Sequence, residues 1–169
     1  MSCFAPTDKR LSTIKARLPG FPLEPMRLMR MSYRLQKTLR DRTIAALKPH
    51  ELTDVSYMVL AVLLGSTDET ASASEVGEAC FEKPANLTRV CDDLQARGLI
   101  ARGERPGDRR AVMLTLTAQG RALIERALPD VVAEIADAYA GFSDAELHTL
   151  AALSERQLNG LNDKAKAAA

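Results

Sequence analysis

Residues 79–120 decide the fold, and they read ACFEKPANLTRVCDDLQARGLIARGERPGDRRAVMLTLTAQG. Pro84 suits the first turn of a helix and Gly98 suits the position after a helix end, so a helix is predicted between them. Apolar residues recur in this helix at steps of three, one and three residues, which places them on one buried face. These residues are Leu87, Val90, Cys91 and Leu94.

The exposed face of this helix changes character along its length. Its N-terminal half offers groups that can bond base edges or phosphates, whereas Asp92 and Asp93 in its C-terminal half repel phosphates. The positive end of the helix dipole also lies at the N-terminus. If the helix binds DNA, its N-terminal half therefore enters the groove; the alternative is a helix face that is only solvated. The candidate DNA-binding residues of this face are Lys83, Asn86, Thr88 and Arg89.

A basic hairpin follows the helix. Residues 99–102 and 112–116 read as two strands, and Pro106-Gly107-Asp108 between them is typical of a tight turn. Arginine on a thin loop suits a narrow minor groove, where the potential is most negative. Asp108 is expected to bond Arg110 and hold that side chain in one rotamer; an ordinary solvated hairpin is the alternative. The arginines around the turn are Arg102, Arg105, Arg109 and Arg110.

Helices on both sides of this region complete a winged helix-turn-helix. An apolar stripe predicts a helix from Pro25 to about Leu47, after an N-terminal arm at 1–24 that holds at most a short helix near residues 8–18. The fold class is therefore mostly α with a small β-hairpin wing (α+β), and the winged helix-turn-helix occupies residues 49–117. N-cap residues and capping boxes mark further helix starts at Thr53, at Ser72 with Glu75, at Thr117, and at Ser143 with Glu146.

Composition and charge are compatible with a cytoplasmic protein that binds nucleic acid. The 169 residues are 46% hydrophobic and 27% charged, which is ordinary for a globular protein. The chain has no apolar run near the roughly 20 residues of a membrane span and no apolar signal core, which indicates the cytoplasm and no membrane partner. The net charge of +1 hides a segregation, because residues 9–48 hold eleven Lys and Arg against two acids, whereas residues 49–82 hold seven acids and no Lys or Arg. A near-neutral total therefore does not exclude DNA.

The combination resembles the signature region of the MarR family of transcription regulators. The matching elements are NLTRVCDDLQARGLI at 86–100, the D-x-R of Asp108 and Arg110, and the LTxxG at 116–120. The resemblance covers about residues 25–160 and is closest to the multidrug-efflux repressors with an N-terminal extension. It implies an obligate homodimer on a pseudo-palindromic operator, with a helical dimerisation region at 25–48 and 118–169. By motif, Asn86, Thr88 and Arg89 match recognition-helix contacts, and Arg110 matches the wing-tip arginine with Asp108 as its partner.

The resemblance also implies an effector crevice between the dimer helices and the winged helix. A small phenolic or aromatic anion is the expected effector, and arginines of the basic first segment could supply its cation. Methionine surfaces adapt to varied apolar shapes, although core or dimer packing is the alternative for these Met and Tyr residues. Acids that could neutralise the basic segment from the other subunit are Glu125, Glu134 and Asp137. The candidate ligand-binding residues are Arg27, Arg30, Tyr33, Arg34, Tyr57 and Met58.

Two other functions are open to a chain of this kind. A thiol-switched repressor would use Cys80, whose thiol pKa Lys83 could depress, whereas Cys91 lies on the buried stripe and reads as a core residue. A winged-helix module that binds a protein rather than DNA is the other alternative. His50 and His148 have no Cys or second His at metal-ligand spacing, and no catalytic pattern is present, so we expect no enzyme, metal or cofactor.

Overall fold

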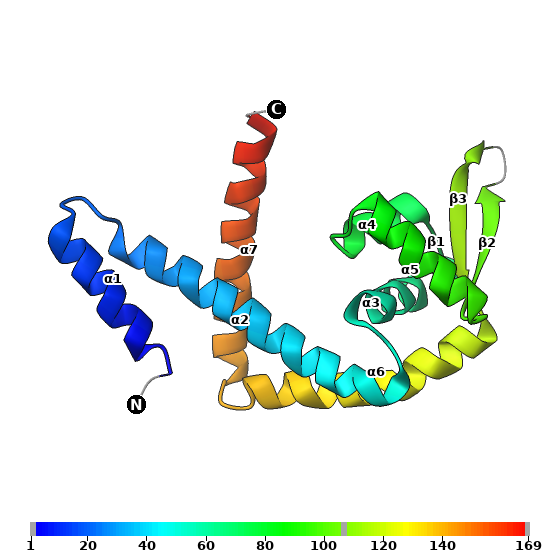
Figure 1. The fold of residues 1–169 in the computed structure, drawn as a ribbon, viewed down its shortest axis with the longest axis horizontal. Helices are drawn as coiled ribbons and strands as arrows, with labels where there is room; N and C mark the ends of the chain where they lie inside the picture. Colours follow the sequence, from blue (N-terminus) through cyan, green and yellow to red (C-terminus); the bar gives the residue numbers. More distant parts are fainter. Residues whose placement is uncertain (1–2, 106–107, 168–169) are drawn as a thin grey trace. The chain divides into compact units, whose positions relative to one another are not determined.

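The computed structural model describes residues 3–105 and 108–167, with the side chains of residues 3–104 and 112–162. The chain forms two compact units, Met1–Glu134 and Ile135–Ala169. The helices and strands in chain order are α1 (Ala5–Arg17), α2 (Leu23–Leu47), α3 (Asp54–Leu64), β1 (Thr70–Ser72), α4 (Ala73–Ala79), α5 (Pro84–Ala96), β2 (Ile100–Arg105), β3 (Asp108–Leu116), α6 (Ala118–Tyr139) and α7 (Asp144–Ala167), with short 3-10 turns at Lys48–His50 and Thr67–Glu69 (Figure 1).

Helices α3, α4 and α5 pack with a small antiparallel sheet and confirm the predicted winged helix-turn-helix. The strand order is β1-β3-β2, with Thr70 opposite Thr115 and Ile100 opposite Leu116. Side chains from the helices and the sheet fill one core, where each fully buried Leu or Val contributes roughly 1.5–3 kcal/mol to stability. The most deeply buried include Leu60, Leu63, Val76, Leu94 and Leu114.

The sheet differs from the sequence prediction in two ways. Strands β2 and β3 are longer than the predicted 99–102 and 112–116, because they continue to pair toward the wing turn. Strand β1 was not predicted at all. It has only three residues, too few for a periodic signal, and its pairing with β3 fixes it. The hydroxyl oxygens of Thr70 and Thr115 lie 3.0 Å apart across this pair.

The predicted helix caps are confirmed. The Thr53 hydroxyl accepts a hydrogen bond from the Ser56 N–H at 3.1 Å, and Ser72 and Glu75 form a reciprocal capping box at the start of α4. In the second unit, the N–H of Ser143 donates to the Glu146 carboxylate at 2.8 Å. Short-range spacing predicted these features because each depends only on residues within one helical turn.

The N-terminal segment is more ordered than the predicted arm. Helix α1 spans 13 residues, where at most a short helix near residues 8–18 was expected, and α2 starts at Leu23 rather than Pro25. Phe4 and Leu11 are buried, and Nε of Arg27 donates to Oδ1 of Asp8 at 2.8 Å, which ties α1 to α2. These contacts join residues far apart in the sequence, so periodicity did not indicate them.

Candidate nucleic-acid interface

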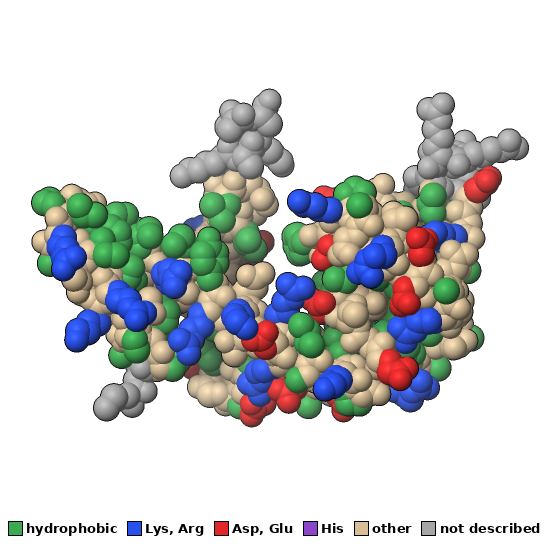
Figure 2. All heavy atoms as spheres, in the orientation of Figure 1, with side chains coloured by type: hydrophobic (Ala, Val, Ile, Leu, Met, Phe, Trp, Pro, Cys, Tyr) green, Lys and Arg blue, Asp and Glu red, His purple; other side chains and the backbone are tan. Residues whose placement is uncertain are grey.

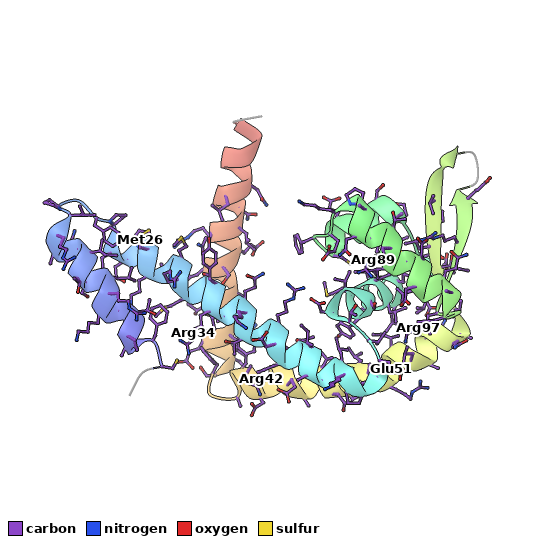
Figure 3. All side chains as sticks on the ribbon, viewed as in Figure 1. Met26, Arg34, Arg42, Glu51, Arg89 and Arg97 are labelled. Carbon is purple, nitrogen blue, oxygen red and sulfur yellow. The ribbon has the colours of Figure 1, made fainter. Side chains whose placement is uncertain are left out.

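The four apolar residues predicted to face the core from α5 are all buried. Consequently, the polar face points outward: Lys83, Thr88 and Arg89 are exposed and Asn86 is half-buried. Lys83 occupies the N-cap position and makes no side-chain cap, so the first N–H groups of α5 keep their positive potential. The structure thus brings all four predicted residues of the helix to one end of it; Figure 3 labels Arg89.

A hydrogen-bond relay orients the candidate base-reading groups. Nη2 of Arg89 donates to Oδ1 of Asn86 at 3.1 Å, and Nδ2 of Asn86 donates to Oε2 of Glu82 at 2.8 Å. Glu82 is a site residue that the sequence prediction missed, although its spacing of four from Asn86 on a helix start was a usable signal. The Thr88 hydroxyl donates to the Pro84 carbonyl at 2.9 Å, so its methyl group and both lone pairs of its oxygen remain for a ligand.

The two acids in the C-terminal half of α5 have cationic partners. Nη1 of Arg102 lies 2.6 Å from Oδ1 of Asp92, and Nη1 of Arg97 lies 3.5 Å from Oδ2 of Asp93. Nη2 of Arg102 also donates to the Thr88 carbonyl at 3.3 Å. Arg102 therefore joins β2 to α5 rather than belonging to the basic cluster at the wing turn, where the sequence placed it. Its pairing also reduces the repulsion that Asp92 would exert on phosphates.

The C-terminal end of α5 is tied to the turn that precedes α3. Nη1 of Arg97 donates to the Glu51 carbonyl at 3.1 Å, and both residues are labelled in Figure 3. Glu51 has a left-handed backbone with φ 55°, which turns the chain from the 3-10 turn toward α3. Side-chain contacts thus hold α5 against both β2 and the segment that precedes α3.

At the tip of the wing, the structure describes the backbone of both strands but not the side chains. Strands β2 and β3 pair as far as Arg105 and Asp108, and the hairpin extends away from the helices (Figure 1). Pro106 and Gly107 lie outside the described residues. The side chains of the predicted wing residues also lie outside them, so their DNA contacts and the bond between Asp108 and Arg110 stay predictions. These wing residues are Arg105, Asp108, Arg109 and Arg110.

The LTxxG element fixes the base of the wing. The hydroxyl oxygen of Thr117 lies 2.7 Å from the Gly98 carbonyl and accepts a bond from the Gly120 N–H at 3.0 Å. A Cβ on Gly120 would lie 2.0 Å from the carbonyl oxygen of Leu99. The motif therefore holds the start of α6 directly against the chain that connects α5 to β2, a contact that only glycine permits.

Two of the three cysteines, Cys80 and Cys91, are buried, which disfavours the reactive thiolate. Cys80 is buried at 9% exposure, and burial raises its thiol pKa from the ordinary 9.0 to about 11. The expectation that Lys83 could depress this pKa is wrong, because desolvation and the Glu82 carboxylate both act against the thiolate. Cys91 is buried on the core face of α5, as predicted, and burial raises its pKa as well.

We expect the two buried thiols to resist oxidants and alkylating reagents. Near neutral pH, iodoacetamide should label the exposed Cys3 first, and peroxide should leave DNA binding unchanged. Mass spectrometry of the labelled peptides shows which cysteine reacts first. Rapid labelling of Cys80 in the folded protein would revive the thiol-switch alternative.

The pKa of Cys80 is higher in the folded state than in the unfolded state. The free energy of unfolding should therefore not depend on Cys80 below about pH 9 and should fall between about pH 9 and about 11.

The six candidate ligand-binding residues do not lie together, and three of them line one hollow. Arg30, Tyr33 and Arg34 line a hollow of about 460 Å³ between α1 and α2, together with Phe4. Arg27 lies outside this lining and is engaged by Asp8. The remaining two candidates, Tyr57 and Met58, belong to α3 and do not line the hollow, and Tyr57 is buried in the core.

Acidic partners of the basic segment come from the same chain. Nε of Arg42 donates to Oε2 of Glu134 at 2.7 Å, although Glu134 was expected to act from another subunit. Beyond that segment, Nε2 of His50 lies 2.7 Å from Oδ2 of Asp130.

Among the residues that the structure describes, no group of three or more His, Cys, Asp or Glu side chains could hold a metal ion. No described helix is both long and apolar enough to cross a membrane.

An exposed polar helix beside a hairpin wing is the arrangement of the winged helix-turn-helix, a DNA-binding fold. The sequence model of the MarR family matches residues 50–111. The transcriptional repressor MprA of Escherichia coli (strain K12) is 30% identical over 128 residues, which are 76% of this chain and 73% of MprA. The chain belongs to the MarR family, whose members are transcriptional regulators and not enzymes.

Solved structures share the fold. The MarR family regulator Sco3205 from Streptomyces coelicolor, in complex with DNA, has a TM-score of 0.75 at 20% identity and covers 82% of this chain and 88% of its own. BpsR from Bordetella bronchiseptica, whose DNA binding is regulated by 6-hydroxynicotinic acid, has a TM-score of 0.61 at 27% identity and covers 75% of this chain and 98% of its own.

Proposed function

We propose that this regulator is a cytoplasmic homodimeric repressor that binds a pseudo-palindromic operator and is released by a small aromatic anion. The main support for DNA binding comes from the N-terminal half of α5, where Arg89 is exposed and is oriented by Asn86 and Glu82. The wing arginines then lie in the adjacent minor groove. Bound in this way over a promoter, the protein represses by excluding RNA polymerase.

Exposed leucines support the dimer. On α2, Leu28 and Leu35 are 57% and 60% exposed, an unusual exposure for large apolar side chains at helical spacing. In the second unit, α7 also exposes several leucines, which suits helices that pack against a second copy. Two recognition helices related by a twofold axis must sit about 34 Å apart to enter successive major grooves. The exposed leucines of α7 are Leu150, Leu153, Leu158 and Leu161.

Selection from a randomised duplex library tests the function directly. We expect the full-length protein to enrich an inverted repeat whose half-site centres lie about one helical turn apart. The affinity for the enriched duplex should fall steeply with salt, since each neutralised phosphate releases counterions. A dimer in analytical ultracentrifugation completes the expected result. Failure to enrich any sequence would favour the protein-binding module instead.

The effector site that we propose is the hollow between α1 and α2. It combines aromatic and cationic groups: the Phe4 ring and the Tyr33 ring lie with the guanidinium groups of Arg30 and Arg34. Neither arginine has an acidic partner in the described salt bridges, whereas Lys37 in the same lining is paired with Asp41. Figure 2 shows many Lys and Arg side chains and few acids over this part of α1 and α2. An aromatic carboxylate fits both the charge and the rings.

Release follows if ligand and DNA favour different dimer geometries. A ligand wedged beside α2 would stabilise a separation of the recognition helices other than the one that DNA requires. The coupling is reciprocal, so operator DNA should weaken ligand binding by the same factor. Regulation of BpsR by 6-hydroxynicotinic acid, an aromatic acid, supports this ligand class.

An Arg30→Ala/Arg34→Ala variant is expected to lose about tenfold or more in affinity for 4-hydroxybenzoate or 6-hydroxynicotinate, because two charge-assisted contacts disappear. Isothermal titration calorimetry on the free dimer measures the change. Arg10→Ala, an exposed arginine of α1 outside the lining, is the matched control and should bind like the wild type. Unchanged affinity in the double variant would place the effector site elsewhere.

A further inference from the structure

Phe81 is the most conspicuous apolar residue on the surface of the winged helix-turn-helix. It lies in the turn between α4 and α5, and its side chain is 93% exposed. Its backbone has a φ of 54°, in the left-handed region that a bulky residue rarely adopts. Both properties are unfavourable for a phenylalanine, and neither is explained by the core.

The turn itself requires the left-handed backbone but not the ring. The N–H of Glu82 donates to the Gly77 carbonyl at 3.0 Å, and the N–H of Phe81 donates to the Glu78 carbonyl at 3.1 Å. This pair of bonds is the usual C-terminal closure of a helix, for which glycine is the preferred residue. The ring also stays in solvent although an open hollow of about 570 Å³ lies beside it between α4 and α5. A residue that breaks local preferences without stabilising the fold points to a contact with a ligand.

The position of Phe81 identifies the kind of ligand. It lies two residues before Lys83, the N-cap of the recognition helix, and directly before Glu82, which begins the relay to Asn86 and Arg89. Phe81 and Thr88 also line the same hollow, so Phe81 lies next to one of the candidate base-contacting residues. The neighbouring carboxylates of Glu78 and Glu82 disfavour a phosphate as the partner of the ring. In the major groove, the apolar feature that a side chain can contact is the 5-methyl group of thymine.

We propose that Phe81 is a specificity-determining residue whose ring contacts the 5-methyl group of one thymine in each half-site. The inference rests on the proposed function, since it requires α5 to enter the major groove. It adds an apolar contact to the polar base contacts of Asn86 and Arg89. The added contact comes from a residue just before the first turn of α5. Burial of one methyl group is worth about a fourfold change in affinity per half-site.

The experiment replaces thymine by deoxyuridine, which removes only the methyl group. Each thymine of the duplex that the wild type selects is replaced in turn, and affinities are measured by fluorescence anisotropy for the wild type, Phe81→Gly and Phe81→Asn. Both substitutions suit a left-handed backbone, so the melting temperature should hold or rise. We expect one position per half-site at which deoxyuridine weakens the wild type about fourfold. The variants should bind the thymine duplex correspondingly less well and should not respond to deoxyuridine at that position.

Each other outcome overturns the inference. Wild-type affinity in both variants would show that the ring makes no contact, and a loss that is equal on all duplexes would show a contact with the backbone rather than the methyl group. In either case the wild type still binds its selected duplex, so the proposed function stands. Failure of the wild type to select any duplex would overturn both.

Discussion

Arg89→Ala is expected to fold like the wild type and to lose sequence-specific DNA binding. The side chain is exposed, so its removal leaves no cavity, and its partner Asn86 keeps its bond to Glu82. A guanidinium that reads a base contributes about 1–3 kcal/mol of discrimination, and a dimer loses it twice, so affinity should fall on the order of 10²-fold or more. The affinity for scrambled duplex should change far less, because phosphate contacts remain.

Anisotropy titrations with the selected and the scrambled duplex measure this loss of specificity. Arg126→Ala is the matched control, because Arg126 is an exposed arginine of α6 that lies outside the recognition helix. The control should keep the specificity ratio of the wild type. If Arg89→Ala keeps that ratio as well, the exposed face of α5 does not read the bases.

Gly120→Ala is expected to produce the largest loss of stability of any Gly→Ala substitution at the glycines that the structure describes. Its Cβ would lie 2.0 Å from the Leu99 carbonyl oxygen and 2.9 Å from Cδ1 of Leu116. A backbone oxygen cannot rotate away as a side chain can, so α6 must separate from the connection between α5 and β2. We expect the free energy of unfolding to fall by about 3 kcal/mol or more.

Chemical denaturation followed by circular dichroism measures this change. Gly103→Ala provides the control, because Gly103 is exposed on β2 and a Cβ there meets nothing within 4 Å. Alanine loses less backbone entropy on folding than glycine, so this control should be neutral or more stable by up to about 1 kcal/mol. Equal stability of the Gly120 variant and the wild type would mean that the LTxxG element tolerates a wider separation than the structure gives.

The sequence predicted those features that depend on neighbours along the chain. The buried face of α5 followed from apolar spacing, and Thr53 and Ser72 were identified by the polar groups of one helical turn. Exposure of Arg89 followed from the same helical count. These signals are local, so tertiary structure did not need to be known.

Contacts that close over long sequence separations were not predictable in this way. Arg102 reads as one more wing arginine until β2 lies beside α5 and brings it to Asp92. Burial of Phe4 and Leu11 depends on the return of the chain after Gly20, where prolines suggested only an arm. The high pKa of Cys80 likewise follows from burial, which a nearby lysine in the sequence does not reveal.

The two tethers on the wing have a consequence for the evolution of binding sites. Arg102 joins β2 to α5, and Thr117 joins the other end of the hairpin to the loop that leaves α5. These contacts hold the helix and the wing at a fixed distance from each other. On the proposed operator, the bases read in the major groove would therefore keep one helical phase relative to the flanking minor-groove tract. On the proposed operator, we therefore expect promoters to tolerate substitution of bases that neither element contacts, whereas an insertion within a half-site would put its two parts out of phase.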